Sequence, residues 1–418
     1  MNLGTSQIDI TPDAGVQLSG FAARTQPSIG VLDSLFAKAL YLEDRGQQLL
    51  WIHCDLIGFD PEIVRSFRRW ALDRFGLQAS QVMLSATHTH SGACTIRLHG
   101  AGDYDSAYVE RLHIWLQQAA EAAMTRTDAV GLVTVEGILD LAIDRRRTNS
   151  AHTDPRVAAL GFRRDDGSFA AVVVNYPMHP VALGSANRHI SADVPGCAAV
   201  ELARQLRGHP VVLATNGACA NLNPPAENVV PAQARTWGGR IAETVAPLLE
   251  KAVPTLAPEL RLAARTIRIP MDTLDLDGIN AFAAKALNDK ESLAVWGENY
   301  RRVVEHWRSS LSDGVRAGHR NGHCDVELFA MDIGGMILLG ANAEVFSEFT
   351  DWLRSATGKT IYLIGYANGD LGYLPTRAAY AEGGYEVEVA HLFHGGFRPK
   401  AGGLELLTQE AAELLRAL

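Results

Sequence analysis

Two histidines stand two residues apart in the segment Ser85-Ala-Thr-His-Thr-His-Ser-Gly92. The segment directly follows residues 82–84, an apolar run that predicts a strand. Residues two apart in extended backbone point to the same side, so His88 and His90 can present two imidazoles to one metal ion or to one substrate. The spacing fits two hydrogen-bonded loop histidines equally well, and both interpretations stay open at this point.

Three other residues, whose side chains can bind a metal or carry a proton, lie near the ends of predicted elements. His179 closes the segment Asn175-Tyr-Pro-Met-His179 after the apolar run 170–174. Glu344 follows the second strand of a predicted hairpin. Asp193, in Ser191-Ala-Asp193-Val-Pro-Gly196, begins a predicted helix, where an N-terminal cap is favoured over a ligand or a base. None of these residues is diagnostic by itself.

The elements that must position these residues alternate between short apolar runs and amphipathic stretches. Short apolar or alternating runs predict strands, and a spacing of three to four residues predicts helices. The first half of the chain predicts strands at 35–42, 48–53, 81–86, 129–135, 157–162, 170–176 and 211–214, and helices at 61–75, 108–123 and about 195–206. This order is typical of a mixed α/β fold.

The second half of the chain has clear signals at a few places. Alternation over 261–270 predicts a half-buried strand, and the charged stretch 276–311 predicts helices inserted between strands. Two apolar runs that meet at Gly334 and Gly335 predict a hairpin. The final residues, LELLTQEAAELLRAL, have the pattern of an amphipathic helix that packs on the core.

Composition places the chain among ordinary globular proteins. Its 418 residues are 47% hydrophobic and 20% charged, which excludes collagen-like, disordered and low-complexity classes. The 38 Lys and Arg against 47 Asp and Glu give a net charge of −9, and no basic run indicates a nucleic-acid partner. No apolar run approaches the roughly 20 residues of a membrane span, and the N-terminus lacks a signal-peptide pattern. We therefore expect a soluble, cytoplasmic protein without stable membrane insertion, while the oligomeric state is not readable from the sequence.

Six segments, taken in their order along the chain, resemble the catalytic domain of the neutral/alkaline ceramidase family. They are Ile8-Asp-Ile-Thr-Pro12, residues 30–39, Ala86-Thr-His-Thr-His-Ser-Gly92, residues 175–179, residues 191–196 and Asn216-Gly-Ala-Cys-Ala-Asn-Leu-Asn-Pro224. Because they span much of the chain, they are far more specific than one pair of histidines. The resemblance implies a single α/β domain over 1–418, built of stacked mixed β-sheets flanked by helices, with a helical insertion at about 276–311.

The resemblance also implies a zinc site. Matched motif by motif, the zinc ligands are His88, His179, Glu344 and Tyr373. His90 then lies beside the metal, and Tyr385, 12 residues after Tyr373, is a second active-site tyrosine. Arg145, in the run Asp144-Arg-Arg-Arg147, resembles an arginine that faces the family's active site. Two imidazoles and a carboxylate are usual ligands of catalytic zinc, although Mn, Fe or Co also accept this ligand set.

The chain departs from the family in the segment that ends at Pro224. Ceramidases carry a catalytic Ser just before this proline, and the residue here is Asn223. Ala220 and Asn221 also replace the Gly-Asp that often precedes that Ser. An amide can orient water or an oxyanion but cannot act as a nucleophile. We therefore expect direct attack by zinc-bound hydroxide, with His90 or Asp193 as proton carriers.

The function expected from the resemblance is a zinc-dependent hydrolase that cleaves the amide C–N bond of a soluble small molecule. A secreted ceramidase carries an additional C-terminal β-rich domain and acts on membrane lipid, so we do not expect a sphingolipid substrate here. Three alternatives stay open. They are an ester or lactone hydrolase on the same site, a catalytically degenerate binding protein, and a metal-assisted isomerase or racemase in which Tyr385 or His90 moves a proton.

Overall fold

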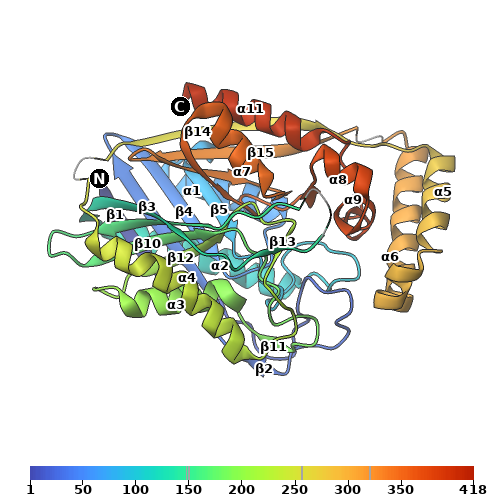
Figure 1. Ribbon diagram of the computed structural model, residues 1–418, viewed down its shortest axis with the longest axis horizontal. Helices are drawn as coiled ribbons and strands as arrows, with labels where there is room; N and C mark the ends of the chain where they lie inside the picture. The colour runs from blue at the N-terminus through green and yellow to red at the C-terminus, as the bar shows by residue number, and fades with distance from the viewer. Residues whose placement is uncertain (147, 149–150, 256–257, 320–321) are drawn as a thin grey trace.

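Three mixed β-sheets form the centre of the computed structural model (Figure 1). The structure describes residues 1–146, 148, 151–255, 258–319 and 322–418. The first sheet has the strand order β5–β4–β3–β1–β6, and its strands are β1 (Asn2–Asp9), β3 (Phe36–Asp44), β4 (Gln47–Cys54), β5 (Val82–Ala86) and β6 (Asp128–Ala129). Within it β3 is antiparallel to β1 and β4, whereas β4 and β5 run parallel. The helices α1 (Pro61–Phe75) and α2 (Ser106–Thr125) contact this sheet.

Local sequence signals explain where α1 begins and ends. Asp60 precedes the helix, and its side chain accepts a hydrogen bond from the backbone N–H of Glu62. Pro61 occupies the first position, where its missing N–H is not needed. Gly76 ends the helix with a φ of 76°, a conformation that glycine adopts without strain. One stripe of the helix faces the core, with Ile63, Val64, Phe67 and Ala71 buried.

The second sheet has the order β12–β10–β9–β7. Its strands are β7 (Gly131–Ile138), β9 (Arg156–Arg163), β10 (Phe169–Tyr176) and β12 (Val211–Asn216). The pair β10 and β12 is parallel, and the other two pairs are antiparallel. Two helices that pack on each other, α3 (Asp193–Gln205) and α4 (Pro231–Lys251), cover its outer face (Figure 1).

The third sheet has the order β14–β15–β16–β18. Its strands are β14 (Leu260–Pro270), β15 (His323–Ile333), β16 (Met336–Ala341) and β18 (Thr360–Ile364). The turn between β15 and β16 holds Gly334 and Gly335 at φ values of 62° and 94°, which explains why two glycines stand there. The helices α7 (Glu348–Thr357) and α11 (Gly403–Ala417) cover the outer face.

The inner faces of the three sheets share one apolar core. Large side chains from each sheet meet in it, including Leu40 and Trp51 from the first, Phe162 and Val173 from the second, and Phe329 and Leu338 from the third. Strands buried on both faces carry continuous apolar runs in place of strict alternation. This is why β4, β10 and β16 were recognisable in the sequence as short apolar runs.

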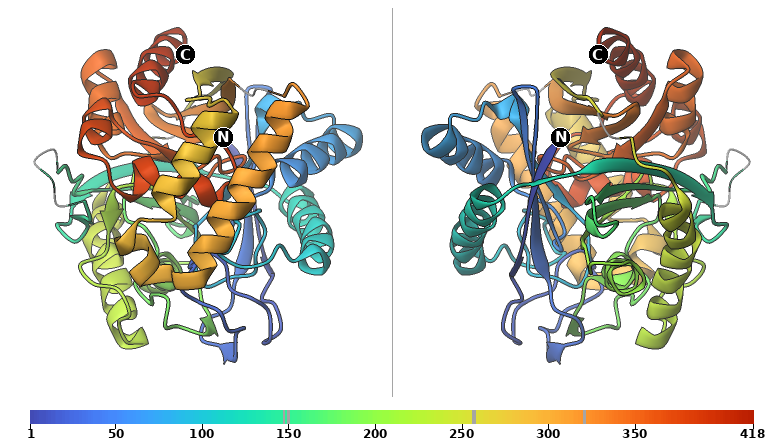
Figure 2. Two further views of the ribbon diagram at one scale, coloured as in Figure 1. Left: turned by 90° about the vertical axis from the view of Figure 1, so that its right-hand side faces the viewer. Right: turned by 90° about the vertical axis from the view of Figure 1, so that its left-hand side faces the viewer.

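Two further helices, α5 (Leu276–Ala286) and α6 (Lys290–Arg316), stand at one end of the molecule (Figure 2). α6 is kinked at Gly297, whose φ of 55° and ψ of −129° are not helical. The two helices pack around Tyr300 and Trp307, and together with α10 (Ala390–Phe393) they enclose a separate apolar cluster. Within the described ranges no helix combines the length and the apolar character needed to cross a bilayer.

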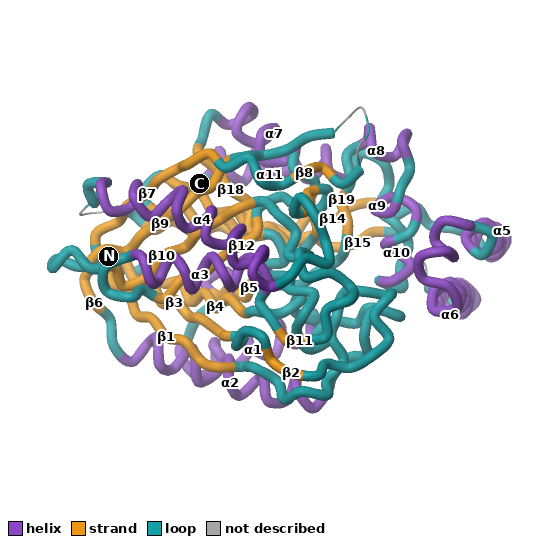
Figure 3. The backbone as a smooth tube through the Cα atoms, turned by 60° about the horizontal axis from the view of Figure 1, so that its bottom comes forward, coloured by secondary structure: helices purple, strands orange, loops and turns teal. Residues whose placement is uncertain are grey.

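Short ribbons connect the loops at the carboxyl ends of the long strands, and Figure 3 shows these loops gathered on one side of the strands. The ribbons pair β2 (Gly30–Val31) with β11 (His189–Ile190), β8 (Ile143–Asp144) with β13 (Leu222–Asn223), and β17 (Glu344–Val345) with β19 (Tyr373–Leu374). The remaining short elements are η1 (Ala79–Gln81), α8 (Arg377–Glu382) and α9 (Tyr385–Glu388).

The predicted mixed α/β fold of stacked mixed sheets flanked by helices is confirmed. The helix predicted over 61–75 coincides with α1, and the hairpin predicted at Gly334 and Gly335 is the β15–β16 pair. The sequence patterns gave no prediction for 225–255 or 345–400, which contain α4, α7 and β18. α5 and α6 occupy the stretch 276–311 and extend slightly beyond it, while the single domain over 1–418 stays a prediction.

A buried histidine in the core makes stability depend on pH. The Ala214 carbonyl can only accept, so the Nε2–H of His53 donates to it at 3.0 Å. Nδ1 of the neutral ring then accepts from the Ser85 hydroxyl at 2.9 Å. Both nitrogens are therefore satisfied in the neutral ring. Burial, with a smaller effect of Lys38, lowers the pKa of His53 from 6.5 to about 3.

The unfolded chain therefore takes up a proton on His53 below pH 6.5 that the folded chain takes up only near pH 3. The free energy of unfolding should be unaffected above pH 6.5 and fall by about 1.4 kcal/mol per pH unit below it, or about 2 kcal/mol at about pH 5. Urea titrations at about pH 7 and about pH 5 measure this loss, and His53→Gln should reduce it. An equal loss in the variant would contradict the assignment.

Candidate metal centre

The carboxyl ends of strands from all three sheets converge on one cavity. The residues that follow them there are His88 after β5, His179 after β10, Glu344 after β16 and Tyr373 after β18. Backbone hydrogen bonds connect the three sheets at this point: Gly365 N–H donates to the Asn216 carbonyl at 3.1 Å, and Ala86 N–H donates to the Tyr366 carbonyl at 3.2 Å. Carboxyl ends of parallel strands are the usual place for a binding site in α/β sheets.

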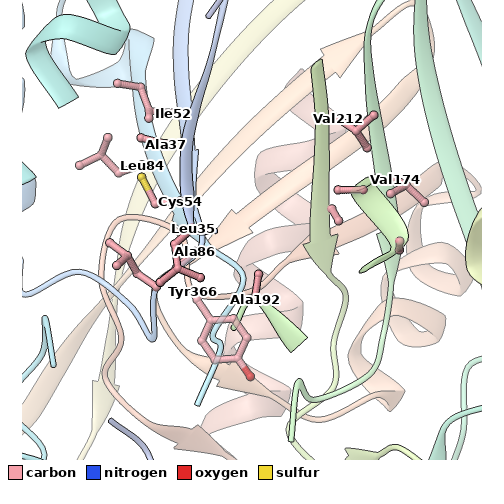
Figure 4. Close-up of a cluster of buried hydrophobic side chains, with 14 of the residues drawn as sticks. Leu35, Ala37, Ile52, Cys54, Leu84, Ala86, Val174, Ala192, Val212 and Tyr366 are labelled. Atoms are coloured by element: carbon pink, nitrogen blue, oxygen red, sulfur yellow. The ribbon is translucent and has the colours of Figure 1, made fainter. Parts of the chain in front are cut away.

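His88 is held by two contacts and by an unusual backbone conformation. Its backbone has a φ of 60°, which is uncommon for a residue with a side chain. Its Nδ1–H donates to the Ile57 carbonyl at 2.6 Å, so the lone pair of the neutral ring is on Nε2. The ring stacks on Tyr366 with centroids 3.8 Å apart and planes 8° apart. Figure 4 shows Tyr366 at the lower end of the apolar side chains of β4 and β5, which fix its position.

The rings of His90 and His179 face each other on the wall of this cavity. Their Nε2 atoms are 3.3 Å apart. Burial, with the nearby His88 adding to its effect, lowers the pKa of both rings well below 6.5, and burial lowers the pKa of His88 to about 4. Three neutral imidazoles therefore share a small volume at neutral pH, which is the protonation state that a metal requires.

Strand pairing places Glu344 beside Tyr373. β17 and β19 are parallel, and Glu344 and Tyr373 are direct partners in their register. Burial raises the pKa of Glu344 well above its usual range, and the Asp370 carboxylate adds to this effect, while Arg145 and the Tyr373 hydroxyl oppose it. Among the described residues Oε2 of Glu344 has no hydrogen-bond partner. A carboxylate oxygen that is buried and unpartnered is costly unless a cation or a proton meets it.

The donor atoms fit one metal ion. Oε2 of Glu344 is 3.8 Å from Nε2 of His88 and 3.9 Å from Nε2 of His179. Ligand atoms around a tetrahedral zinc ion with bonds near 2.0–2.1 Å are about 3.4 Å apart, so a small inward shift brings these atoms to that spacing. The ligand atoms of His88, His90 and His179 also lie within 4.8 Å of one another.

Arg145 connects the tyrosine to a buried carboxylate. Its Nε donates to Glu386 at 2.8 Å, and its two terminal nitrogens donate to the Tyr373 hydroxyl at 3.1 Å and to the Asn223 side-chain oxygen at 3.3 Å. Arg146 donates to the other oxygen of Glu386 at 2.6 Å. Arg147, the third arginine of this run, lies outside the described residues. The arrangement fixes the guanidinium of Arg145 against the ring of Tyr373.

The cavity has a volume of about 650 Å³. Its lining includes every residue assigned to the site from the sequence except Asp193: His88, His90, Arg145, His179, Asn223, Glu344, Tyr373 and Tyr385. Phe21, Trp296 and Phe393 add an apolar wall. Tyr385 lies between this wall and the candidate metal ligands, with its ring 5.7 Å from that of Tyr373 and 5.9 Å from that of Trp296. This size suits a drug-sized ligand.

Asp193 is placed differently from the other candidates. It does not line the cavity, and its two carboxylate oxygens accept hydrogen bonds from the backbone N–H groups of Val194 and Leu183. It is the first residue of α3, so it resembles the capping residue that was the alternative interpretation, although Ala192 occupies the cap position. Burial raises its pKa to about 6. Its position gives no support to a role as proton carrier.

Three residues of the site were not singled out in the sequence as parts of it. Asp370 lies within 4.8 Å of the ligand atoms of His88 and Glu344, and Glu386 and Arg146 complete the ion-pair network of Arg145. Asp370 stands three residues before Tyr373 in a glycine-rich loop, and Glu386 directly follows Tyr385. An acidic residue so close to an implied site tyrosine is a signal that was available.

No family model matches the sequence. The neutral ceramidase of Pseudomonas aeruginosa is 26% identical over 218 residues, which is 47% of this chain and 32% of the ceramidase. The match therefore covers about a third of that relative's length.

Two solved structures share the fold. The neutral ceramidase from Pseudomonas aeruginosa superposes with a TM-score of 0.75 and 19% identity, over 98% of this chain and 73% of the other. A ceramidase complexed with C2 gives a TM-score of 0.75 and 18% identity, over 100% of this chain and 75% of the other. The resemblance of this chain to the neutral ceramidases is thus confirmed, in fold over nearly the whole chain and in sequence over about half of it.

Proposed function

We propose that this protein is a zinc-dependent hydrolase that cleaves an amide C–N bond of a soluble small molecule. One observation carries the proposal: Nε2 of His88 and Nε2 of His179 lie 3.8 and 3.9 Å from Oε2 of Glu344 on the wall of a cavity, in the fold of a neutral ceramidase. That relative is named a ceramidase, and a ceramide is a lipid with an amide bond. Of this activity, we propose only amide cleavage for the present chain.

His88, His179 and Glu344 would hold the ion, and Tyr373 stands next to Glu344 as a fourth donor. Zinc in such a set supplies a water whose pKa is lowered to about 7 and which is the nucleophile. The surroundings of the imidazoles favour binding of a cation. The Ile57 carbonyl fixes the tautomer of His88, and burial keeps the imidazoles neutral, so they do not repel a cation.

Arg145 and the two tyrosines supply positive charge and donors for the oxyanion. The guanidinium donates to the Tyr373 hydroxyl oxygen, which leaves the hydroxyl proton of Tyr373 free to donate. Burial raises the pKa of Tyr373 and of Tyr385, so both remain protonated donors at neutral pH in the absence of an ion. Donors fixed before the reaction stabilise the developing charge without reorganisation.

His90 is the proton carrier in this proposal. It lines the cavity beside His179, and its ring is neutral at neutral pH and can accept a proton. The amine that leaves needs a proton, and the same ring can deliver it. Asn223 is held by Arg145 and by Glu227, to which its side-chain N–H donates at 2.7 Å, so it serves to orient groups and not as a nucleophile.

The experiment that tests the proposal begins with zinc analysis of untagged protein purified without added metal. We expect about one zinc per chain. The protein is then assayed on matched amides and esters that share one acyl group, with an N-acyl sphingosine included, and product mass is recorded. Amide cleavage supports the proposal. Cleavage of the ester alone would show an esterase, and bound zinc without turnover would show a binding protein. A product of unchanged mass would show an isomerase.

Gly20 limits the position of His90. A Cβ added at Gly20 would lie 2.4 Å from Nδ1 of His90, and the residue has a φ of 95°. Gly20→Ala should therefore displace the ring and reduce kcat/KM by at least about tenfold, because misplacing a catalytic group by about 1 Å has effects of this order. Gly15→Ala is the matched control, since Gly15 has a φ of 104° and no described atom within 4 Å of an added Cβ.

Both variants strain the backbone by a similar amount, about 1 kcal/mol of unfolding free energy, and Gly20→Ala should lose more than this because its Cβ also displaces the His90 ring. Only Gly20→Ala should lose activity. Equal activity of the two variants would show that His90 has no part in the reaction.

A further inference from the structure

Asp370 is a second buried carboxylate beside the candidate metal centre. Its side chain is fully buried, and its Oδ1 accepts a hydrogen bond from the backbone N–H of Gly372 at 2.9 Å. Its Oδ2 has no hydrogen-bond partner in the part of the chain that the structure describes. Oδ2 lies 3.9 Å from Nδ1 of His88.

The cavity contains two buried carboxylates that have no cation in direct contact among the described residues. Oε2 of Glu344 and Oδ2 of Asp370 are both buried and unpartnered among the described residues. The guanidinium of Arg145, which lines the same cavity, forms an ion pair with Glu386 at 2.8 Å. One divalent ion next to Glu344 would balance both charges at once.

Asp370 faces the edge of the His88 ring that does not bind the ion. Nε2 of His88 is the nitrogen with the free lone pair, and it faces Glu344 at 3.8 Å. Oδ2 of Asp370 is closest to Nδ1, whose proton goes to the Ile57 carbonyl. A negative charge on this side makes the imidazole a stronger electron donor at Nε2, as carboxylates behind metal-binding histidines do.

We propose that Asp370 is a positioning residue of the metal centre, which acts through His88 and balances, with Glu344, the charge of one divalent ion. The inference rests on the proposed function, because it assumes that His88 binds a metal. It assigns to Asp370 a role in metal affinity and none in coordination.

The test compares Asp370→Asn with the unchanged protein by competition for zinc with a chelator. Asparagine keeps the shape and the acceptor for Gly372 but removes the charge. The zinc Kd of the variant should rise about 10- to 100-fold, while the stoichiometry at saturation stays at one. The visible spectrum of the cobalt-substituted protein should be unchanged, because no ligand is removed.

A second readout separates this role from a merely structural one. In the metal-free protein, Asp370→Asn removes a buried unmatched charge, so the Tm should not fall, whereas the rise in Tm caused by zinc should become smaller. A structural residue would lower the Tm in both states. Glu348→Gln is the matched control, since Oε2 of Glu348 is likewise buried without a described partner but lies outside the cavity.

Each outcome decides the inference. An unchanged zinc Kd in Asp370→Asn overturns it, and so does a changed cobalt spectrum, which would make Asp370 a ligand. A similar loss of affinity in Glu348→Gln also overturns it. If the unchanged protein itself binds no zinc, cobalt or other divalent ion, the proposed function is wrong. This result is distinct from the three results above, in which the unchanged protein binds zinc and only the role of Asp370 is wrong.

Discussion

Replacing His179 by alanine should abolish zinc binding and lower kcat/KM for amide cleavage by more than about 10³-fold, equivalent to about 4 kcal/mol of transition-state stabilisation. The same result is expected for His88→Ala. Each substitution removes one of the two imidazoles whose Nε2 atoms lie 3.8 and 3.9 Å from the unpartnered oxygen of Glu344. Without the ion, the attacking water keeps its ordinary pKa, which is the reason for the expected loss.

The two variants also separate binding from chemistry. If zinc content and activity fall together, the ion is part of the reaction. If zinc falls but activity remains, the hydrolysis does not use the metal, and the proposal is wrong. His189→Ala is the control, because His189 is exposed and lies outside the cavity, so it should retain both zinc and activity.

The fold was predictable where apolar runs are continuous and helix caps are clear. α1 is the best case, since Asp60, Pro61 and Gly76 mark its ends. α4 was not predicted, although it has a buried stripe, because it begins without a side-chain cap and contains Pro247 in its last turns. The short strands β17 and β19 were beyond reach, since two residues carry no periodic signal.

The candidate site was predictable residue by residue through the resemblance, but its assembly was not. His88, His179 and Glu344 lie far apart in the sequence and follow strands of three different sheets. Their meeting depends on sheet contacts such as the hydrogen bond from Gly365 to Asn216, which no local pattern indicates. Asp370 and Glu386 were missed because an acidic residue is usually solvated, so their burial was not expected; the available sequence signal was that each stands within three residues of a site tyrosine.

Arg145→Met should reduce both activity and stability. The variant removes the donor to the Tyr373 hydroxyl and to Asn223, and it leaves Glu386 with Arg146 alone. We expect kcat/KM to fall about 10²- to 10³-fold, as for the loss of an oxyanion-stabilising group. The free energy of unfolding should fall by about 2–3 kcal/mol, because a hydrogen-bonded buried charge pair is broken.

Arg146→Met makes this interpretation testable, because the two arginines share Glu386 but differ in their other contacts. Arg146 donates to the Gly383 and Ala379 carbonyls and makes no described hydrogen bond to Tyr373 or Asn223. Its loss should lower stability by a similar amount in urea titrations but change kcat/KM much less, by up to about tenfold. If both variants lost activity equally, the effect of Arg145 would come from Glu386 and the packing around it, and the charge held against Tyr373 would have no catalytic role.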